Sequence, residues 1–122
     1  MNRDELKGRT KGLAHRCVRV AGALPQAVVA KIISGQLIRS STSVAANYRA
    51  ACLSQSKKTF IAKLSIVIEE CDETEFWFEF IIEEKLLKKN LVETLLNEAH
   101  QLTSIFIASR KTASKPIVHL PS

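Results

Sequence analysis

The residues best suited to chemistry are the carboxylates in the middle of the chain, among them Glu69, Glu70 and Glu73. Carboxylates facing one another across a helix bundle can hold a di-iron centre, but that centre also needs Glu-x-x-His motifs on two helices. The sequence contains no Glu-x-x-His. Glu98 and His100 are two residues apart, so they cannot share one helix face. We therefore predict no metal and no other cofactor.

Other catalytic patterns are equally absent from the sequence. There is no Gly-rich phosphate loop and no Ser/His/Asp or Cys/His arrangement, and His15 and His119 stand alone. Cys17, Cys52 and Cys71 form no CxxC motif, and each lies in a helical pattern where cysteine acts as a small apolar residue. These features predict a non-enzymatic protein with reduced thiols, which fits the cytoplasm.

A second group of polar residues falls on two consecutive predicted helices. Arg39, Ser43 and Asn47 are spaced i, i+4 and i+8 on one helix, and Glu70 and Glu73 lie on the next. If these helices pack antiparallel about a turn near residue 55, Arg39 reaches Glu70 or Glu73 in a charge-assisted pair. We favour a hydrogen-bonded network that fixes the helix register. A ligand or active site between the helices, or a contact between subunits, remains an alternative.

Charge is divided unevenly along the chain. Residues 1–63 carry twelve Lys and Arg against two acidic residues, whereas residues 64–122 carry six against ten. This division favours pairing of basic and acidic helices within the bundle or between subunits, and it also suits a basic surface for the phosphates of RNA or DNA. Both interpretations can hold together. The candidate nucleic-acid contacts are Lys7, Lys11, Arg16, Arg19, Arg49, Lys57 and Lys58.

Hydrophobic periodicity predicts long helices. The segment 58–84 contains no Gly or Pro, and its apolar face recurs at steps of four and three residues. We predict helices over residues 3–23, 25–53, 57–87 and 91–113. Asn2 or Asp4 is expected to cap the first, Ser56 the third and Asn90 the fourth, and Pro25 opens the second. Residues 114–122 are predicted to form an irregular tail.

Inward positions follow from the same periodicity. The predicted buried faces comprise Leu6, Thr10, Leu13, Cys17, Val20 and Leu24; Val29, Ile33, Leu37, Ser40, Val44, Asn47 and Ala51; Phe60, Leu64, Val67, Cys71, Thr74, Phe78 and Ile81; and Leu91, Leu95, Ala99, Leu102, Phe106 and Ser109. Because the predicted connections are short, consecutive helices must reverse direction. We expect residues 1–113 to form one domain, an all-α, antiparallel, up-down-up-down, left-handed four-helix bundle. The polar N-terminus and the lack of a bilayer-length apolar run predict no membrane partner.

Two polar signatures resemble a known family. The pattern R-S-x-x-S-x-x-x-N matches residues 39–47, and F-x-x-K-L followed by E-x-x-E-T-x-x-W matches residues 60–77. Both resemble the bacterial four-helix-bundle proteins encoded in intervening sequences of large-subunit ribosomal RNA, and the likeness extends over roughly residues 4–113.

That resemblance implies a four-helix bundle that assembles into a homopentamer and has no established enzymatic activity. We therefore expect a non-enzymatic, oligomeric bundle that binds RNA or DNA through its basic helical surface. The alternative is a protein–protein assembly or adaptor module whose charges only hold subunits together, with no nucleic-acid role.

Overall fold

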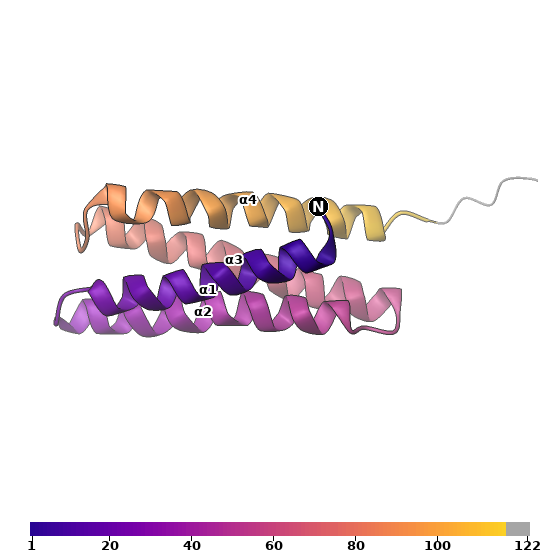
Figure 1. The fold of residues 1–122 in the computed structure, drawn as a ribbon, viewed down its shortest axis with the longest axis horizontal. Coiled ribbons are helices and arrows are strands. Elements are labelled where there is room, and N and C mark those ends of the chain that lie inside the picture. The colour runs from indigo at the N-terminus through magenta and orange to yellow at the C-terminus, as the bar shows by residue number, and fades with distance from the viewer. Residues whose placement is uncertain (117–122) are drawn as a thin grey trace, which may run out of the picture.

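Four helices make up the fold. The computed structural model describes residues 1–116, which form α1 (Arg3–Ala23), α2 (Val28–Cys52), α3 (Lys57–Glu83) and α4 (Lys89–Ala113), with no strand among them. Consecutive helices run in opposite directions (Figure 1). The predicted all-α four-helix bundle is confirmed, while its left-handed sense stays a prediction. Most of the predicted tail, including His119, falls in residues 117–122, which lie outside the described part of the chain.

Two of the predicted N-caps are present. The Asn2 side chain accepts a hydrogen bond from the Glu5 N–H at 2.8 Å, and Ser56 Oγ accepts one from the Thr59 N–H at 3.1 Å. Each satisfies a backbone donor that has no partner inside its own helix. Local sequence therefore determines where α1 and α3 begin.

The predicted starts of the second and fourth helices are wrong. Pro25 lies in the turn, and α2 begins at Val28 after Ala27, which has an extended backbone. Leu24 before the proline is extended and buried, so the chain uses this turn to cross from α1 to α2. Asn90 lies inside α4, whose N-cap is Lys88 and carries no side-chain cap.

The third helix ends before its predicted limit at Leu87. Lys85 adopts a left-handed backbone with φ 55°. Its N–H bonds to the Ile82 carbonyl and the Leu86 N–H to the Ile81 carbonyl, both at 3.0 Å. These bonds form a Schellman motif, which normally carries glycine at the left-handed position. Because lysine occupies it here, no glycine marks the end of α3 in the sequence.

The predicted buried face of α3 is confirmed almost completely. Phe60 is partly buried against the core, and the other six residues of that face are fully buried. The predictions of the buried faces of α2 and α4 are partly wrong. Val29 is 50% exposed, and Tyr48, rather than the half-buried Asn47, fills the core beside Phe106, with ring centroids 5.0 Å apart.

An error of the same kind affects the start of α4. Leu91 is 57% exposed, and its neighbour Val92 is fully buried. The two side chains point about 100° apart around the helix, and only one of them can face the other three helices. In α1 the predicted face holds except that Val20 is half-buried, while Ala14 and Ala21 are buried.

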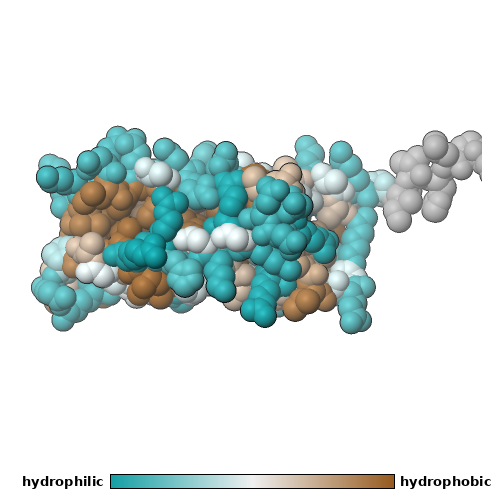
Figure 2. All heavy atoms as spheres, viewed as in Figure 1, coloured by the Kyte–Doolittle hydropathy of each residue, from teal (hydrophilic) through white to brown (hydrophobic). Residues whose placement is uncertain are grey.

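Packing differs around the bundle. Consecutive helices lie against each other along most of their length, whereas α1 and α4 touch over a shorter stretch (Figure 1). On the visible face, apolar surface gathers at the end that carries the α1–α2 and α3–α4 turns (Figure 2). No helix of residues 1–116 is long and apolar enough to cross a lipid bilayer.

Candidate nucleic-acid interface and interhelical polar cluster

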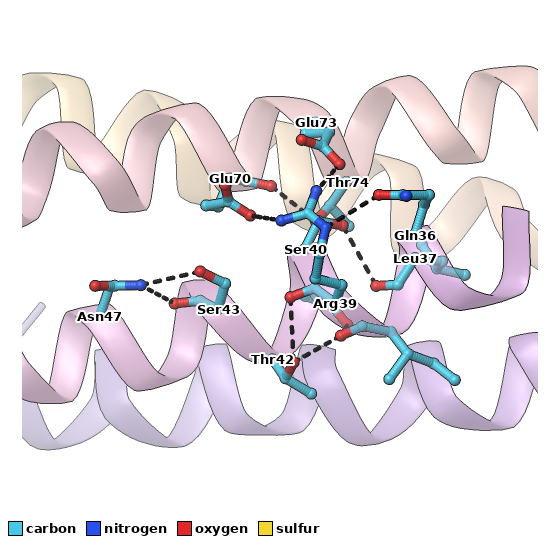
Figure 3. Close-up of polar contacts among 12 residues, drawn as sticks. Gln36, Leu37, Arg39, Ser40, Thr42, Ser43, Asn47, Glu70, Glu73 and Thr74 are labelled. Atoms are coloured by element: carbon cyan, nitrogen blue, oxygen red, sulfur yellow. Dashed lines mark hydrogen bonds and ion pairs between the residues drawn. The ribbon is translucent and has the colours of Figure 1, made fainter. Parts of the chain in front are cut away.

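The α2–α3 contact brings Arg39 against two carboxylates. Its Nη1 lies 2.9 Å from Glu70 Oε2, and its Nη2 pairs with Glu73 (Figure 3). The Trp77 indole N–H donates to Glu73 Oε2 at 2.9 Å, and Gln36 accepts from Arg39 Nε at 3.0 Å. The Arg39 guanidinium on α2 therefore contacts two successive turns of α3.

The cluster shifts the acid–base equilibria of its members. Partial burial alone would raise the pKa of Glu73, but the hydrogen bonds from Trp77 and Arg39 outweigh it and hold that pKa below its ordinary value. The hydrogen bond to Glu73 raises the pKa of Arg39. The Arg39 side chain is 48% exposed, so Arg39, Glu70 and Glu73 form a surface ion-pair cluster rather than a buried ion pair. We call this cluster the Arg39 clasp.

Ser43 and Asn47 do not join the Arg39 cluster. The Asn47 amide donates to the Ser43 carbonyl at 3.0 Å and to Ser43 Oγ at 2.9 Å, and both residues belong to α2 (Figure 3). A buried link instead connects the two helices: Thr74 Oγ1 donates to Ser40 Oγ at 3.0 Å, and both residues are fully buried. The five predicted network residues therefore form two separate groups, and the buried contact lies beside them.

Glu75 and His100 form a contact between α3 and α4 that was not predicted from the sequence. Glu75 on α3 is 7% exposed and accepts from Thr103 Oγ1 at 3.1 Å, while His100 Nδ1 lies 2.7 Å from its other oxygen. The two partners lie on α4, at least 25 residues away, and no spacing rule joins them. Within residues 1–116, no group of three or more His, Cys, Asp or Glu side chains is placed to hold a metal ion.

The three thiols are free, and the two buried ones are unlike catalytic cysteines. Burial raises the pKa of Cys17 to about 12 and that of Cys71 to about 11. Cys71 donates to the Ala99 carbonyl at 3.3 Å, and Cys52 is half-buried. A reactive cysteine needs a lowered pKa, so Cys17 and Cys71 act as small core residues.

The predicted basic residues fall into three places. Lys7, Lys11 and Arg49 line a groove of about 590 Å³ between α1 and α2. Arg16 and Arg19 are exposed on α1 outside that groove. Lys57 and Lys58 begin α3, at the end of the bundle where the α2–α3 turn lies (Figure 1).

Further cations join Lys57 at this end. The beginning of α1, the beginning of α3 and the end of α4 meet there, and a hollow of about 670 Å³ is lined by residues that include Arg3, Lys57 and Lys115. Lys57 Nζ donates to the Lys115 carbonyl at 3.0 Å, and the Arg3 guanidinium lies 5.1 Å from the centre of the Phe60 ring. Among the residues that the structure describes, no carboxylate lines the hollow.

We call this hollow and Lys58 beside it the basic end. Asp4 and Glu5 in the first turn of α1 offset part of its charge. Lys57 and Lys58 were predicted from the sequence as nucleic-acid contacts, whereas Arg3 and Lys115 were not. The signal was available, because an up-down-up-down bundle places the starts of the first and third helices beside the end of the fourth.

These features define an all-α four-helix bundle with a polar clasp between α2 and α3 and a basic end. The chain belongs to the family of 23S rRNA-intervening sequence proteins, which it matches over residues 5–108. It is also similar to the crystal structure of a protein of unknown function of the S23 ribosomal protein family from Bacteroides thetaiotaomicron. The identity is 31%, the TM-score is 0.81, and the match covers 87% of this chain and 98% of that one. No curated protein matches the sequence.

Proposed function

We propose that this protein is a non-enzymatic bundle that assembles with copies of itself, as a homopentamer, and binds RNA in the cytoplasm. The observation that carries the RNA-binding part is the basic end, where cations from three helix termini surround a hollow that no carboxylate of residues 1–116 lines. RNA is favoured over DNA because the family takes its name from 23S ribosomal RNA.

Phosphate contact, rather than base stacking, is the mode of binding. Within residues 1–116, Phe60 is the only aromatic residue that lines the hollow, and its ring lies next to the Arg3 guanidinium. Lysine and arginine side chains that neutralise phosphates release counterions, so affinity depends on salt and little on sequence. The first backbone N–H groups of α3 face the same end and add the positive pole of its dipole.

The test is a charge reversal with a matched control. Lys57→Glu with Lys58→Glu changes two lysines at the start of α3, and Lys88→Glu with Lys89→Glu makes the same change at the start of α4. Carboxylates suit a helix N-terminus, so both variants should fold. We expect the first variant to bind single-stranded RNA more weakly and its plot of log affinity against log salt to flatten by roughly 1.4 units, at about 0.7 per phosphate contact.

The control should bind as the wild type does. Equal losses in the two variants would show that net charge, and not the basic end, governs binding. Affinity that does not change with salt would rule out phosphate contact.

The second candidate is an assembly or adaptor module without a nucleic-acid role. It is favoured by the acidic surface of α3, whose exposed Glu69, Asp72 and Glu79 make no ion pair within residues 1–116. An oligomer that retards no RNA or duplex DNA at micromolar protein and low salt would select this candidate.

A further inference from the structure

Two oppositely charged surfaces of the bundle have no partner within the described chain. Its ion pairs between acidic residues and Lys or Arg use Arg9, Arg39 and Lys89. The groove cations Lys7, Lys11 and Arg49 take part in none of them, and neither do Glu69, Asp72 and Glu79 on α3. The charge division seen in the sequence is therefore only partly neutralised inside one molecule.

The groove between α1 and α2 has a charged half and an apolar half. Two contacts, Arg3 with the Cys52 carbonyl and Ser34 with the Ala21 carbonyl, set the antiparallel register of these helices. In that register Arg49 lies level with Lys7, and the lining residues towards the other end are Ala14, His15, Val18 and Thr42, which carry no Lys or Arg. Small side chains line much of the groove, with Ala14, Ala45 and Ala46 among them, so a third helix can approach closely.

The outer surface of α3 carries the complementary pattern. Glu69 and Asp72 are exposed, and Phe76 follows them at 49% exposure. The Phe76 ring contacts those of Trp77 and Phe80, with centroids 4.9 and 5.9 Å apart. Trp77 and Phe80 are themselves partly buried against the core, so Phe76 is the ring that this surface exposes beside its acidic residues. An exposed aromatic ring of this kind is typical of an interaction surface.

Spacing matches the two surfaces to each other. Lys11 and Val18 are seven residues apart on α1, and Glu69 and Phe76 are seven residues apart on α3, so each pair spans about 10.5 Å along its helix. In both pairs the charged residue precedes the apolar one. We propose that α3 of a second copy of this chain docks into the α1–α2 groove, parallel to α1, with Glu69 at Lys11 and Phe76 at Val18.

This contact joins two different surfaces, so it is heterologous. Because α1 and α3 run parallel within one bundle (Figure 1), docking α3 parallel to α1 leaves both copies pointing the same way. Each copy then offers a free groove and a free α3 face, and repetition leads to a ring if the rotation closes. The inference rests on the self-assembly part of the proposed function and names its surfaces; the RNA contacts at the basic end are separate residues.

The decisive experiment mixes two variants. Val18→Glu blocks the groove and Phe76→Glu blocks the α3 face; both side chains are about half exposed, so the fold should survive, as circular dichroism will verify. By light scattering after size exclusion, the wild type should be an oligomer and each variant alone a single chain of 13.6 kDa. An equimolar mixture should form only a dimer, because one intact groove meets one intact α3 face.

The control and the charge pair sharpen the result. Ile107→Glu places the same charge at a 44% exposed position on α4 and should leave the oligomer unchanged. Lys11→Glu and Glu69→Lys should each raise the dissociation constant of the oligomer about tenfold, and the two changes in one chain should restore it.

Three results would overturn the inference. If the wild type stays monomeric at high micromolar concentration, no second copy docks into the groove. Variants that keep the wild-type mass, or a mixture that does not dimerise, would show that these two surfaces do not meet. Loss of RNA affinity in Lys11→Glu with unchanged mass would assign the groove to nucleic acid, whereas Lys57→Glu with Lys58→Glu tests RNA binding without touching this interface.

Discussion

The contact between α2 and α3 and the contact between α1 and α4 are held together in different ways. The α2–α3 contact runs along both helices, with the buried Ser40–Thr74 hydrogen bond inside and the Arg39 clasp outside. The α1–α4 contact is shorter, and its polar link is Arg9, which donates to Glu98 at 3.0 Å and also bonds Gln101. Apolar packing dominates the α2–α3 contact, whereas the Arg9–Glu98 ion pair secures the α1–α4 contact.

This difference reflects chain connectivity. A short turn forces α2 and α3 to lie side by side, so their apolar faces meet along most of their length. No turn joins α1 to α4, and the bundle closes there through side chains alone. Gly8 and Gly12 also weaken the first half of α1, each by up to about 1 kcal/mol relative to alanine. We expect local opening to begin at the α1–α4 contact.

The largest expected effect on stability comes from the core at the α2–α3 contact. Leu37→Ala on α2 removes a fully buried side chain and should lower the free energy of unfolding by about 2–5 kcal/mol, because a cavity remains. Leu53→Ala, at a 72% exposed position at the end of α2, should change it by less than about 0.5 kcal/mol. Urea unfolding measures both, and equal losses would mean that Leu37 is not in the core.

A smaller, local effect is expected at the α1–α4 contact. Arg9→Ala removes an ion pair whose side chains are about one-fifth exposed and should cost about 1 kcal/mol. Hydrogen exchange should rise in the first turns of α1 and stay unchanged in α2. Arg16→Ala, an exposed α1 residue without an ion pair in residues 1–116, should alter neither. Uniform acceleration across all four helices would contradict the comparison.

The smallest effect is the pH dependence of the Arg39 clasp. Since the folded state lowers the pKa of Glu73, its ionised form adds stability above the unfolded pKa of about 4.3. That stability is lost as the pH falls through the lower folded pKa. Between pH 7 and pH 3, wild type should therefore lose up to about 1 kcal/mol more than Glu73→Gln. Glu84→Gln, exposed at the end of α3, should behave as wild type; a Glu73→Gln variant with the wild-type pH profile would refute this role.

Much of the fold could be predicted because its signals are local. The four-and-three spacing of α3 identified its core residues, and Asn2 and Ser56 identified two helix starts. The end of α3 escaped prediction because its left-handed residue is Lys85 rather than glycine. Tyr48 and Val92 are buried where the sequence predicted their neighbours Asn47 and Leu91. Rotating an amphipathic helix by one residue changes its hydrophobic spacing little, so the pattern did not distinguish the two positions.

The polar groups were harder to predict. Antiparallel pairing about the α2–α3 turn was enough to place Arg39 near Glu70 and Glu73, since the turn fixes the register of its two helices. The same logic did not join Ser43 and Asn47 to that cluster, because neighbours on one helix can satisfy each other first.

The sequence by itself determined that four helices form and, for the most part, which faces they bury. Helical spacing and helix caps depend on residues only a few positions apart in the chain. The sequence also placed Arg39 near Glu70 and Glu73, but only the tertiary structure decided three other contacts: Lys57 with the Lys115 backbone, His100 with Glu75, and Arg9 with Glu98. These partners are 58, 25 and 89 residues apart, and their meeting depends on the rotation and level of whole helices against one another.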